Sequence, residues 1–289
     1  MQYAPDKESI TTHFDYHFIH DTLVKIDALG HELPTSLKHI CEALNLKVTD
    51  IPIDDKKTMQ IFSSLKPLNV NPENYDSQIG TLGVPEFGTG FLRQMLNDTK
   101  PKTFSELVYI SGLSHGTSVW LGNAQELINK KTATLKEVIS TRDDIMEYLI
   151  RKGLEKGLAF SIMESVRRGR GLTPEFEKAM KENKVPDWYI ESCKKIKYMF
   201  PKAHAVAYTI MSFRIAYIKI HHPEHFYADY LNRDIGGFEY EFMAMDMDAI
   251  KKRLRESKFI KEPDKKEKDR LRVLEVLFEM KVMASCSAA

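Results

Sequence analysis

A series of helix-start signals in the second half of the chain constrains the fold more than any other sequence feature. Thr103 and Thr134 each stand three residues before a glutamate, and this pattern is typical of a capping box, in which a hydroxyl caps the helix and a carboxylate reaches back. Thr141 and Thr173, which precedes a proline, mark two further starts. Residues 203–222 contain no Gly or Pro and predict about 30 Å of helix. The chain is therefore expected to be rich in α-helix.

Weaker signals flank this helical region. Apolar spacing predicts a helix starting at Thr35 or Ser36, and the acidic pair Asp54-Asp55 predicts a second, shorter one. Residues 65–89 are rich in Pro, Asn and Gly, so we expect a long connection there. Near the end of the sequence, a charged stretch leads into one amphipathic helix over 271–280, and residues 282–289 show no pattern.

Composition excludes several classes of protein. The 289 residues carry 42 basic and 41 acidic side chains, so a nucleic-acid-binding surface would have to be local. The three cysteines, Cys41, Cys193 and Cys286, are too far apart for a disulfide framework or a Cys-based zinc site, which indicates a reducing compartment. Neither a secretory signal nor an apolar run of bilayer length is visible, so we expect a cytoplasmic location and no membrane partner.

Residues 23–31 have the pattern of a strand that ends at Gly30. In a strand, Val24 and Ile26 would share one face and would be anchored to a core. Lys25 and Asp27 would then leave the opposite face, about 7 Å apart along the strand. On this pattern alone, such a pair is more typical of a solvated strand face than of a site that needs a cation beside a carboxylate.

Two histidine clusters allow a metal-binding and a structural interpretation. His13, His17 and His20 have the spacing of zinc ligands on one helix, but aromatic residues are interleaved and no cysteine completes four ligands. We therefore favour an aromatic–histidine packing cluster. His221 and its neighbours surround a proline at the end of a predicted helix, where cations interact favourably with the helix dipole.

Other motifs are consistent with contacts to phosphate. Arg167, Arg168 and Arg170 end a basic stretch and would suit either nucleic-acid phosphates or a solvated helix face. The glycine-bearing segments 83–89 and 111–117 could approach a ligand through backbone N–H groups, although neither is a Walker or Rossmann motif.

Taken together and in this order, the motifs carry a specific resemblance that covers nearly the whole chain. The chain resembles part of the catalytic subunit of the bacterial replicase, the PolC-type DNA polymerase III alpha family: the last piece of its palm, its fingers and the start of the region that follows. The matching segments are Thr11–His17, Lys25–His31, Gly83–Thr89, Ser111–Thr117, Trp120–Ala124, Lys195–His204 and His221–Pro223.

The resemblance implies two-metal nucleotidyl transfer by a DNA-directed DNA polymerase. In this chemistry two Mg²⁺ ions about 3.5–4 Å apart clamp the attacking and leaving oxygens. Three aspartates hold the ions in the family, and Asp27 resembles the third of them, while Lys25 resembles the basic residue that faces the triphosphate. No Asp-x-Asp motif precedes Asp27. We therefore expect an incomplete Mg²⁺ site and a chain that is inactive by itself.

The resemblance also implies binding residues outside the palm. Ser114, His115, Lys202 and His204 lie in motifs similar to the family's nucleotide-facing surface, and the arginines of 167–170 would contact DNA.

The expected fold is mainly α, with a short α/β palm remnant at the N-terminus. The expected domains are the palm end over 1–35, the fingers over 36–232 and the start of the DNA- and clamp-binding region over 233–289. The expected partners are primer-template DNA, dNTP, the remainder of the polymerase, and the sliding clamp and replisome, at the nucleoid in the cytoplasm. The alternative is a stand-alone helical nucleic-acid-binding module without catalysis.

Overall fold

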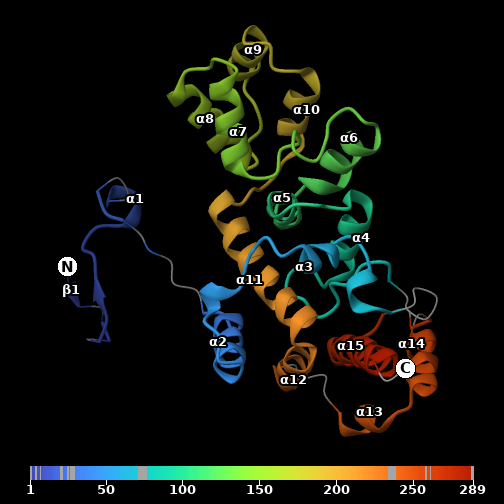
Figure 1. Ribbon diagram of the computed structural model, residues 1–289. Coiled ribbons are helices and arrows are strands. Elements are labelled where there is room, and N and C mark those ends of the chain that lie inside the picture. The colour runs from blue at the N-terminus through green and yellow to red at the C-terminus, as the bar shows by residue number, and fades with distance from the viewer. Residues whose placement is uncertain are drawn as a thin grey trace. The chain divides into compact units, whose positions relative to one another are not determined.

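The protein is mainly α-helical, as the sequence predicts (Figure 1). The computed structural model describes residues 2–3, 5–6, 8–19, 22–24, 26, 30–70, 77–233, 239–257, 259–260 and 262–287. The chain divides into two compact units, Met1–Thr35 and Ser36–Ala289.

Most helices of the described residues belong to the second unit. The elements are β1 (Gln2–Tyr3), β2 (Ile10–Thr11), α1 (Tyr16–Ile19), α2 (Leu33–Ala43), η1 (Val48–Asp50), α3 (Lys56–Gln60), η2 (Lys66–Leu68), α4 (Gly90–Thr99), α5 (Phe104–His115), η4 (Trp120–Ala124), α6 (Gln125–Asn129), α7 (Arg142–Arg151), α8 (Lys156–Arg167), α9 (Pro174–Glu182), α10 (Asp187–Lys195), α11 (Lys202–His221), α12 (Pro223–Arg233), α13 (Tyr240–Ala244), α14 (Met247–Ser257) and α15 (Lys265–Ser287).

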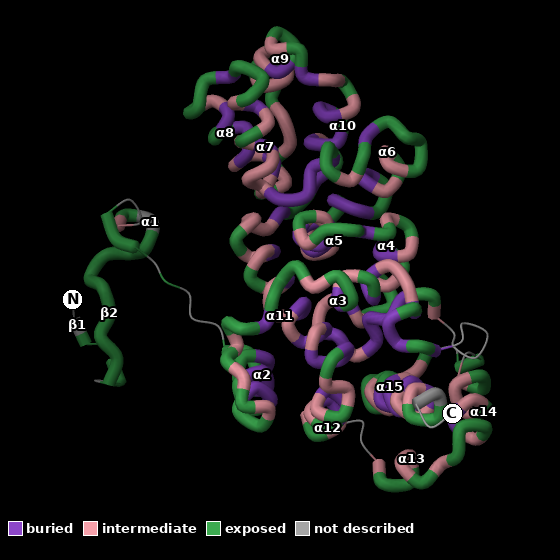
Figure 2. Tube along the Cα trace, viewed as in Figure 1, coloured by how far each residue is buried: buried purple, intermediate pink, exposed green. Residues whose placement is uncertain are grey.

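The first unit differs from the sequence prediction. Its strands β1 and β2 have two residues each and pair as an antiparallel hairpin. Val24 and Ile26, expected on the buried face of a strand, are 90% and 86% exposed and lie outside any strand. Within the described residues, this unit contains the hairpin, α1 and the first three residues of α2, and Figure 2 colours the hairpin and α1 almost entirely as exposed. A strand needs neighbouring strands and an apolar face to be stable, which explains the difference.

Several predicted helix starts are confirmed by their hydrogen bonds. The Asp55 carboxylate accepts from Thr58 N at 2.7 Å at the start of α3. Thr103 and Glu106 form a capping box at α5, and the Thr173 hydroxyl accepts from Phe176 N at 3.3 Å at α9. The 20-residue helix predicted for 203–222 is α11. Each of these caps joins residues three positions apart, so they form wherever the local sequence allows.

Three helix predictions differ from the structure. Helix α2 begins at Leu33, so Thr35 and Ser36 lie inside it and do not cap it. The Glu137 carboxylate does accept from Thr134 N as expected, but the Thr134 hydroxyl donates to the same carboxylate instead of capping a backbone N–H. Only a turn follows, because the chain must reach Thr141 in extended form to start α7. Ser140 is held there by a bond from its hydroxyl to Tyr109 O at 2.8 Å. At the other end, α15 continues through Ser287.

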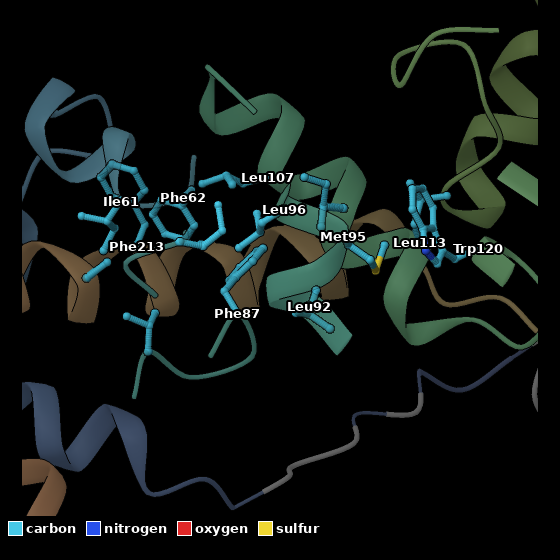
Figure 3. Close-up of a cluster of buried hydrophobic side chains, with 14 of the residues drawn as sticks. Ile61, Phe62, Phe87, Leu92, Met95, Leu96, Leu107, Leu113, Trp120 and Phe213 are labelled. Atoms are coloured by element: carbon cyan, nitrogen blue, oxygen red, sulfur yellow. The ribbon is translucent and has the colours of Figure 1, made fainter. Parts of the chain in front are cut away.

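The core of the second unit forms along α11. Phe213 of this helix stacks on Phe62, with ring centroids 5.9 Å apart, and Phe62 meets Phe87 edge to face at 5.3 Å. Figure 3 shows these rings beside Leu96 and Leu107, which α4 and α5 contribute. Figure 1 shows α7–α10 at one end of this unit and α12–α15 at the other, with α11 between them. Side chains at the two ends of α11 therefore have very different surroundings.

A buried ion pair joins α11 to α15. The Lys219 ammonium lies 2.6 Å from Glu279, and both side chains are completely buried. The ammonium also donates to Gly80 O at 2.9 Å and to Leu82 O at 2.6 Å, so its three protons meet three acceptors. Tyr227 of α12 donates to Glu279 at 2.8 Å. Burial lowers the pKa of Lys219, against the opposing effect of the Glu279 carboxylate.

Over the described ranges, none of the helices combines the length and the apolar character that crossing a membrane would require.

Candidate functional site

Two of the motifs found in the sequence lie side by side in the structure. Thr117, after the end of α5, pairs with Tyr198, just before α11, as an isolated antiparallel bridge. Thr117 N donates to Tyr198 O at 2.9 Å, and Lys197 N donates to Thr117 O at 3.0 Å. A β-carbon on Gly116 would lie 2.9 Å from Tyr198 O, so this close approach requires glycine. The bridge brings the end of α5 and the start of α11 together.

His115, the last residue of α5, is held by acceptors at both ring nitrogens. Nδ1 lies 2.6 Å from Ser111 O, and because a carbonyl only accepts, Nδ1 carries a proton. Nε2 lies 3.2 Å from the Glu86 carboxylate. The hydrogen bond to Glu86 raises the pKa of His115, burial opposes it, and the bond to Ser111 adds to the rise. These two contacts hold the ring in position and favour its protonated form.

Glu86 reaches His115 from the tight glycine segment 83–89. Its backbone has φ +62°, in the left-handed region that residues other than Gly, Asn and Asp seldom adopt. A β-carbon on Gly88 would lie 2.6 Å from Val84 O, and the Thr81 hydroxyl donates to Phe87 O at 2.7 Å. The loop is thus closely packed on itself and presents the carboxylate at a defined position.

Aromatic rings surround His115 and His204. The His204 ring stacks on Phe200 with centroids 4.7 Å apart and lies 4.5 Å from the Tyr208 ring. His115 meets His204 edge to face at 5.3 Å. Burial lowers the pKa of His204, and the charge on His115 lowers it further. The surroundings therefore favour the protonated form of His115 and the neutral form of His204.

Lys202 begins α11 and binds the first turn of α7. Its backbone N–H donates to Asp143 at 2.6 Å, and its ammonium lies 3.2 Å from Asp144 and 3.7 Å from Glu147. Burial acts to lower the pKa of Lys202, but the carboxylates, Asp144 first, outweigh it and raise the pKa. The side chain remains 37% exposed, so its charge is accessible to a ligand.

The predicted arginine cluster shares one carboxylate. Arg167 makes a two-pronged contact with Glu164, with one bond of 2.8 Å, and Arg168 lies 2.9 Å from the same carboxylate. The bond from Arg167 lowers the pKa of Glu164 despite partial burial. Arg170 is exposed. The backbone at Gly169 passes close to Lys197 O, which anchors this segment to the strand-like stretch before α11.

Lys25 and Asp27 lie outside the described residues, and so does His20 of the first histidine cluster. Among the residues that the structure describes, no three His, Cys, Asp or Glu side chains gather closely enough to hold a metal ion. That part of the chain does not fit a two-metal site by itself.

Sequence reasoning missed the partners of the predicted residues. Glu86, Ser111 and Phe200 lie inside quoted motifs, but their roles as partners of His115 and His204 were not predicted. Ser111 and Phe200 each precede their histidine by four residues, whereas Glu86 meets His115 from a separate segment. Asp144 was singled out as part of a helix start, and its second role beside Lys202 has no local signal.

Comparisons with known proteins agree with the resemblance. The sequence model of the family described as "Bacterial DNA polymerase III alpha subunit finger domain" matches residues 33–184, more than half of the chain. The chain is 55% identical over 285 residues to DNA polymerase III PolC-type of Staphylococcus haemolyticus, covering 97% of this chain and 20% of that protein. It is 56% identical over 278 residues to the Listeria innocua protein of the same name, covering 96% and 19%.

The PolC-type protein of Oceanobacillus iheyensis is 57% identical over 272 residues, which is 93% of this chain and 19% of the relative. The chain thus spans about a fifth of the length of these curated relatives. The match to the finger-domain model, supported by these long and similar alignments, shows that the chain belongs to the bacterial DNA polymerase III alpha subunit family and corresponds to a segment of its PolC-type members.

Proposed function

We propose that this chain forms the fingers of a PolC-type replicative DNA polymerase and presents His115, Lys202, His204 and Ser114 to the incoming dNTP. The observation that carries this proposal is the Thr117–Tyr198 bridge, because it brings the end of α5, which carries Ser114 and His115, next to the start of α11, which carries Lys202 and His204.

The charges of this surface suit a triphosphate. His115 in its protonated form supplies a positive charge, and because the ring is already held by Glu86 and Ser111 it need not reorient when an anion binds. Lys202 supplies a second charge, which a phosphate would attract away from Asp144 and Glu147. The Ser114 hydroxyl donates to Ser111 O at 2.8 Å and still offers lone pairs.

Arg168 and Arg170, with Arg167 beside them, are proposed to contact DNA phosphates. Glu164 compensates only part of the charge of the two arginines that it binds, and Arg170 adds an exposed cation. DNA binding through such contacts weakens steeply as the salt concentration rises.

The remaining assignments follow from the family. We propose the palm end over 1–35, the fingers over 36–232 and the start of the following region over 233–289. Asp27 would hold Mg²⁺ together with carboxylates from the remainder of the polymerase, and Lys25 would face the triphosphate. Mg²⁺, when bound, supplies charge stabilisation at the attacking and leaving oxygens. The sliding clamp and replisome are partners proposed for the full-length protein, acting on the bacterial chromosome in the cytoplasm.

Binding of a fluorescent primer-template tests the proposal. We expect binding by the chain to fall with rising salt and to strengthen when the correct dNTP is added. His115→Gln and Lys202→Gln should each reduce the dNTP effect, whereas Lys130→Gln, an exposed substitution on the turn after α6, should leave it unchanged. Salt-dependent binding that ignores dNTP in the unsubstituted chain would instead favour the stand-alone nucleic-acid-binding module.

Primer extension with Mg²⁺ and dNTPs tests the expected inactivity. The chain alone should add no nucleotides. Robust templated synthesis would overturn the view that its metal site is incomplete.

A further inference from the structure

The buried ion pair between α11 and α15 also holds the segment that leads into the loop 83–89. The Lys219 ammonium donates to Gly80 O at 2.9 Å and to Leu82 O at 2.6 Å, and these two residues stand just before the loop. Glu279 of α15 lies 2.6 Å from the same ammonium. Helix α15 is therefore connected to the start of this loop by direct contacts.

The start and the end of the loop are bonded to each other. The Thr81 hydroxyl donates to Phe87 O at 2.7 Å, and Thr81 O accepts from Val84 N at 2.9 Å. The Phe87 ring packs edge to face on Phe62 in the core (Figure 3). Glu86 lies between these fixed points, so its position depends on how the start of the loop is held.

The backbone of Glu86 needs such support. Its φ of +62° lies in the left-handed region, which is strained for a residue with a glutamate side chain. Strained conformations of this kind persist only where the surrounding structure fixes them. Without the bonds from Lys219, the loop would relax toward ordinary backbone angles, and the carboxylate would leave its position 3.2 Å from His115 Nε2.

The protonation of His115 depends most on Glu86. The hydrogen bond to Glu86 is the largest of the effects that raise the pKa of His115, ahead of the bond to Ser111 O. The other titratable side chains with ring contacts to His115 in the described part of the chain are His204 and Tyr208 of α11, with centroids 5.3 and 6.1 Å away. Neither replaces the carboxylate near neutral pH, so a displaced Glu86 would leave the imidazolium without its counter-charge.

We propose that Lys219 and Glu279 are remote positioning residues for His115, acting through the loop 83–89 and Glu86. The pair holds the start of the loop, the loop holds Glu86 in its strained conformation, and Glu86 holds the charged ring. Because α15 supplies Glu279, the docking of this helix then controls a site at the end of α5. The consequence for dNTP binding rests on the proposed function, whereas the link to His115 rests on the contacts alone.

NMR titration of the histidine rings tests the link without any nucleotide. Lys219→Met/Glu279→Leu removes the two bonds to the loop and leaves no unpaired buried charge. We expect it to lower the pKa of His115, in the same direction as Glu86→Gln. Adding Glu86→Gln to the double variant should then lower that pKa less than it does in the parent, because both changes act through one contact. An unchanged pKa of His115 in the double variant would overturn the proposal.

Thr81→Val tests the same link from inside the loop and leaves the buried pair intact. It removes the bond to Phe87 O and should also lower the pKa of His115. If the double variant fails to fold, this variant alone decides, and an unchanged pKa would overturn the proposal.

Met180→Ala is the control for a general loss of stability. Met180 is fully buried on α9, which Figure 1 shows at the opposite end of the second unit from α15. The substitution should lower the melting temperature and leave the pKa of His115 unchanged. A fall in this pKa as large as in the other variants would overturn the proposal, because loss of stability would then explain it.

Binding of primer-template with the correct dNTP separates this inference from the proposed function. The strengthening by dNTP should fall about 3- to 10-fold in Lys219→Met/Glu279→Leu, while binding of primer-template alone stays unchanged. A lowered pKa of His115 with an undiminished dNTP effect would support the link and contradict the dNTP-facing role of His115. An unchanged pKa with a diminished dNTP effect would overturn the link and leave that role standing.

Discussion

The two ends of helix α11 carry lysines in opposite environments. Lys202, in the first turn, is 37% exposed and shares the carboxylates of Asp144 and Glu147. Lys219, near the end of the same helix, is completely buried and meets Glu279 and two backbone carbonyls. One residue type on one helix therefore serves two different purposes.

Burial explains the difference. A half-exposed ammonium is solvated whether or not its partner is present, so it can exchange a carboxylate for a phosphate at low cost. A buried ammonium cannot be solvated by water, so its three acceptors must stay in place. The Lys219 end consequently holds the fold together, while the Lys202 end is free to take part in binding.

Removal of Lys219 should have the largest effect on stability. Lys219→Met leaves Glu279 charged in a dry environment and orphans the carbonyls of Gly80 and Leu82, so we expect a loss of about 3–5 kcal/mol in the free energy of unfolding. Urea denaturation measures this loss.

The double variant Lys219→Met/Glu279→Leu separates the cost of the unpaired Glu279 charge from the cost of the two orphaned carbonyls. With neither charge buried, it should recover part of the loss, although the two carbonyls remain without their donor. A single variant as stable as the parent would contradict the structural role of the pair.

The contact between His115 and Glu86 should have an intermediate effect that depends on pH. Because the pKa of His115 is raised in the folded protein, the stability it contributes is complete below the unfolded pKa of about 6.5 and is lost as the pH rises through the folded pKa. The difference in unfolding free energy between the parent and His115→Gln should be about 1.5–3 kcal/mol in the acidic range and should shrink on the alkaline side.

His204→Gln is the internal comparison for this experiment. The pKa of His204 is lowered in the folded protein, so this histidine reduces the free energy of unfolding as the pH falls. His204→Gln should therefore stabilise the protein at acidic pH. Titration of the two rings by NMR should show His204 losing its proton first, and Glu86→Gln should lower the pKa of His115. A stability difference for His115→Gln that stayed constant with pH would contradict the charged imidazolium.

Lys202→Met should have the smallest effect on stability. The ion pairs of Lys202 are partly exposed, so we expect a loss of less than about 1 kcal/mol, measured by the same urea titration. The comparison of the two lysines predicts a clear gap between this variant and Lys219→Met. Equal losses would show that Lys202 is also structural.

The accuracy of the sequence predictions differed between local and long-range features. Asp55, Thr103 and Thr173 were expected to start helices and do so, because each cap bonds to a residue three positions away. Thr134 N donates to Glu137 as expected, yet no helix follows, because the chain has to place Ser140 against Tyr109. The strand expected over 23–31 is absent from its described residues, since Val24 and Ile26 find no apolar surface.

The sequence by itself determined the α-rich class, most helix starts and the family, because these depend on local bonding and on the order of motifs along the chain. Only the tertiary structure decided that Glu86 fixes His115, that Lys202 meets Asp144 and that Lys219 is buried with Glu279. Each of these pairs joins segments far apart in the sequence. A charged side chain carries no local sign of its partner, and its pKa and its role are set by the burial that folding produces.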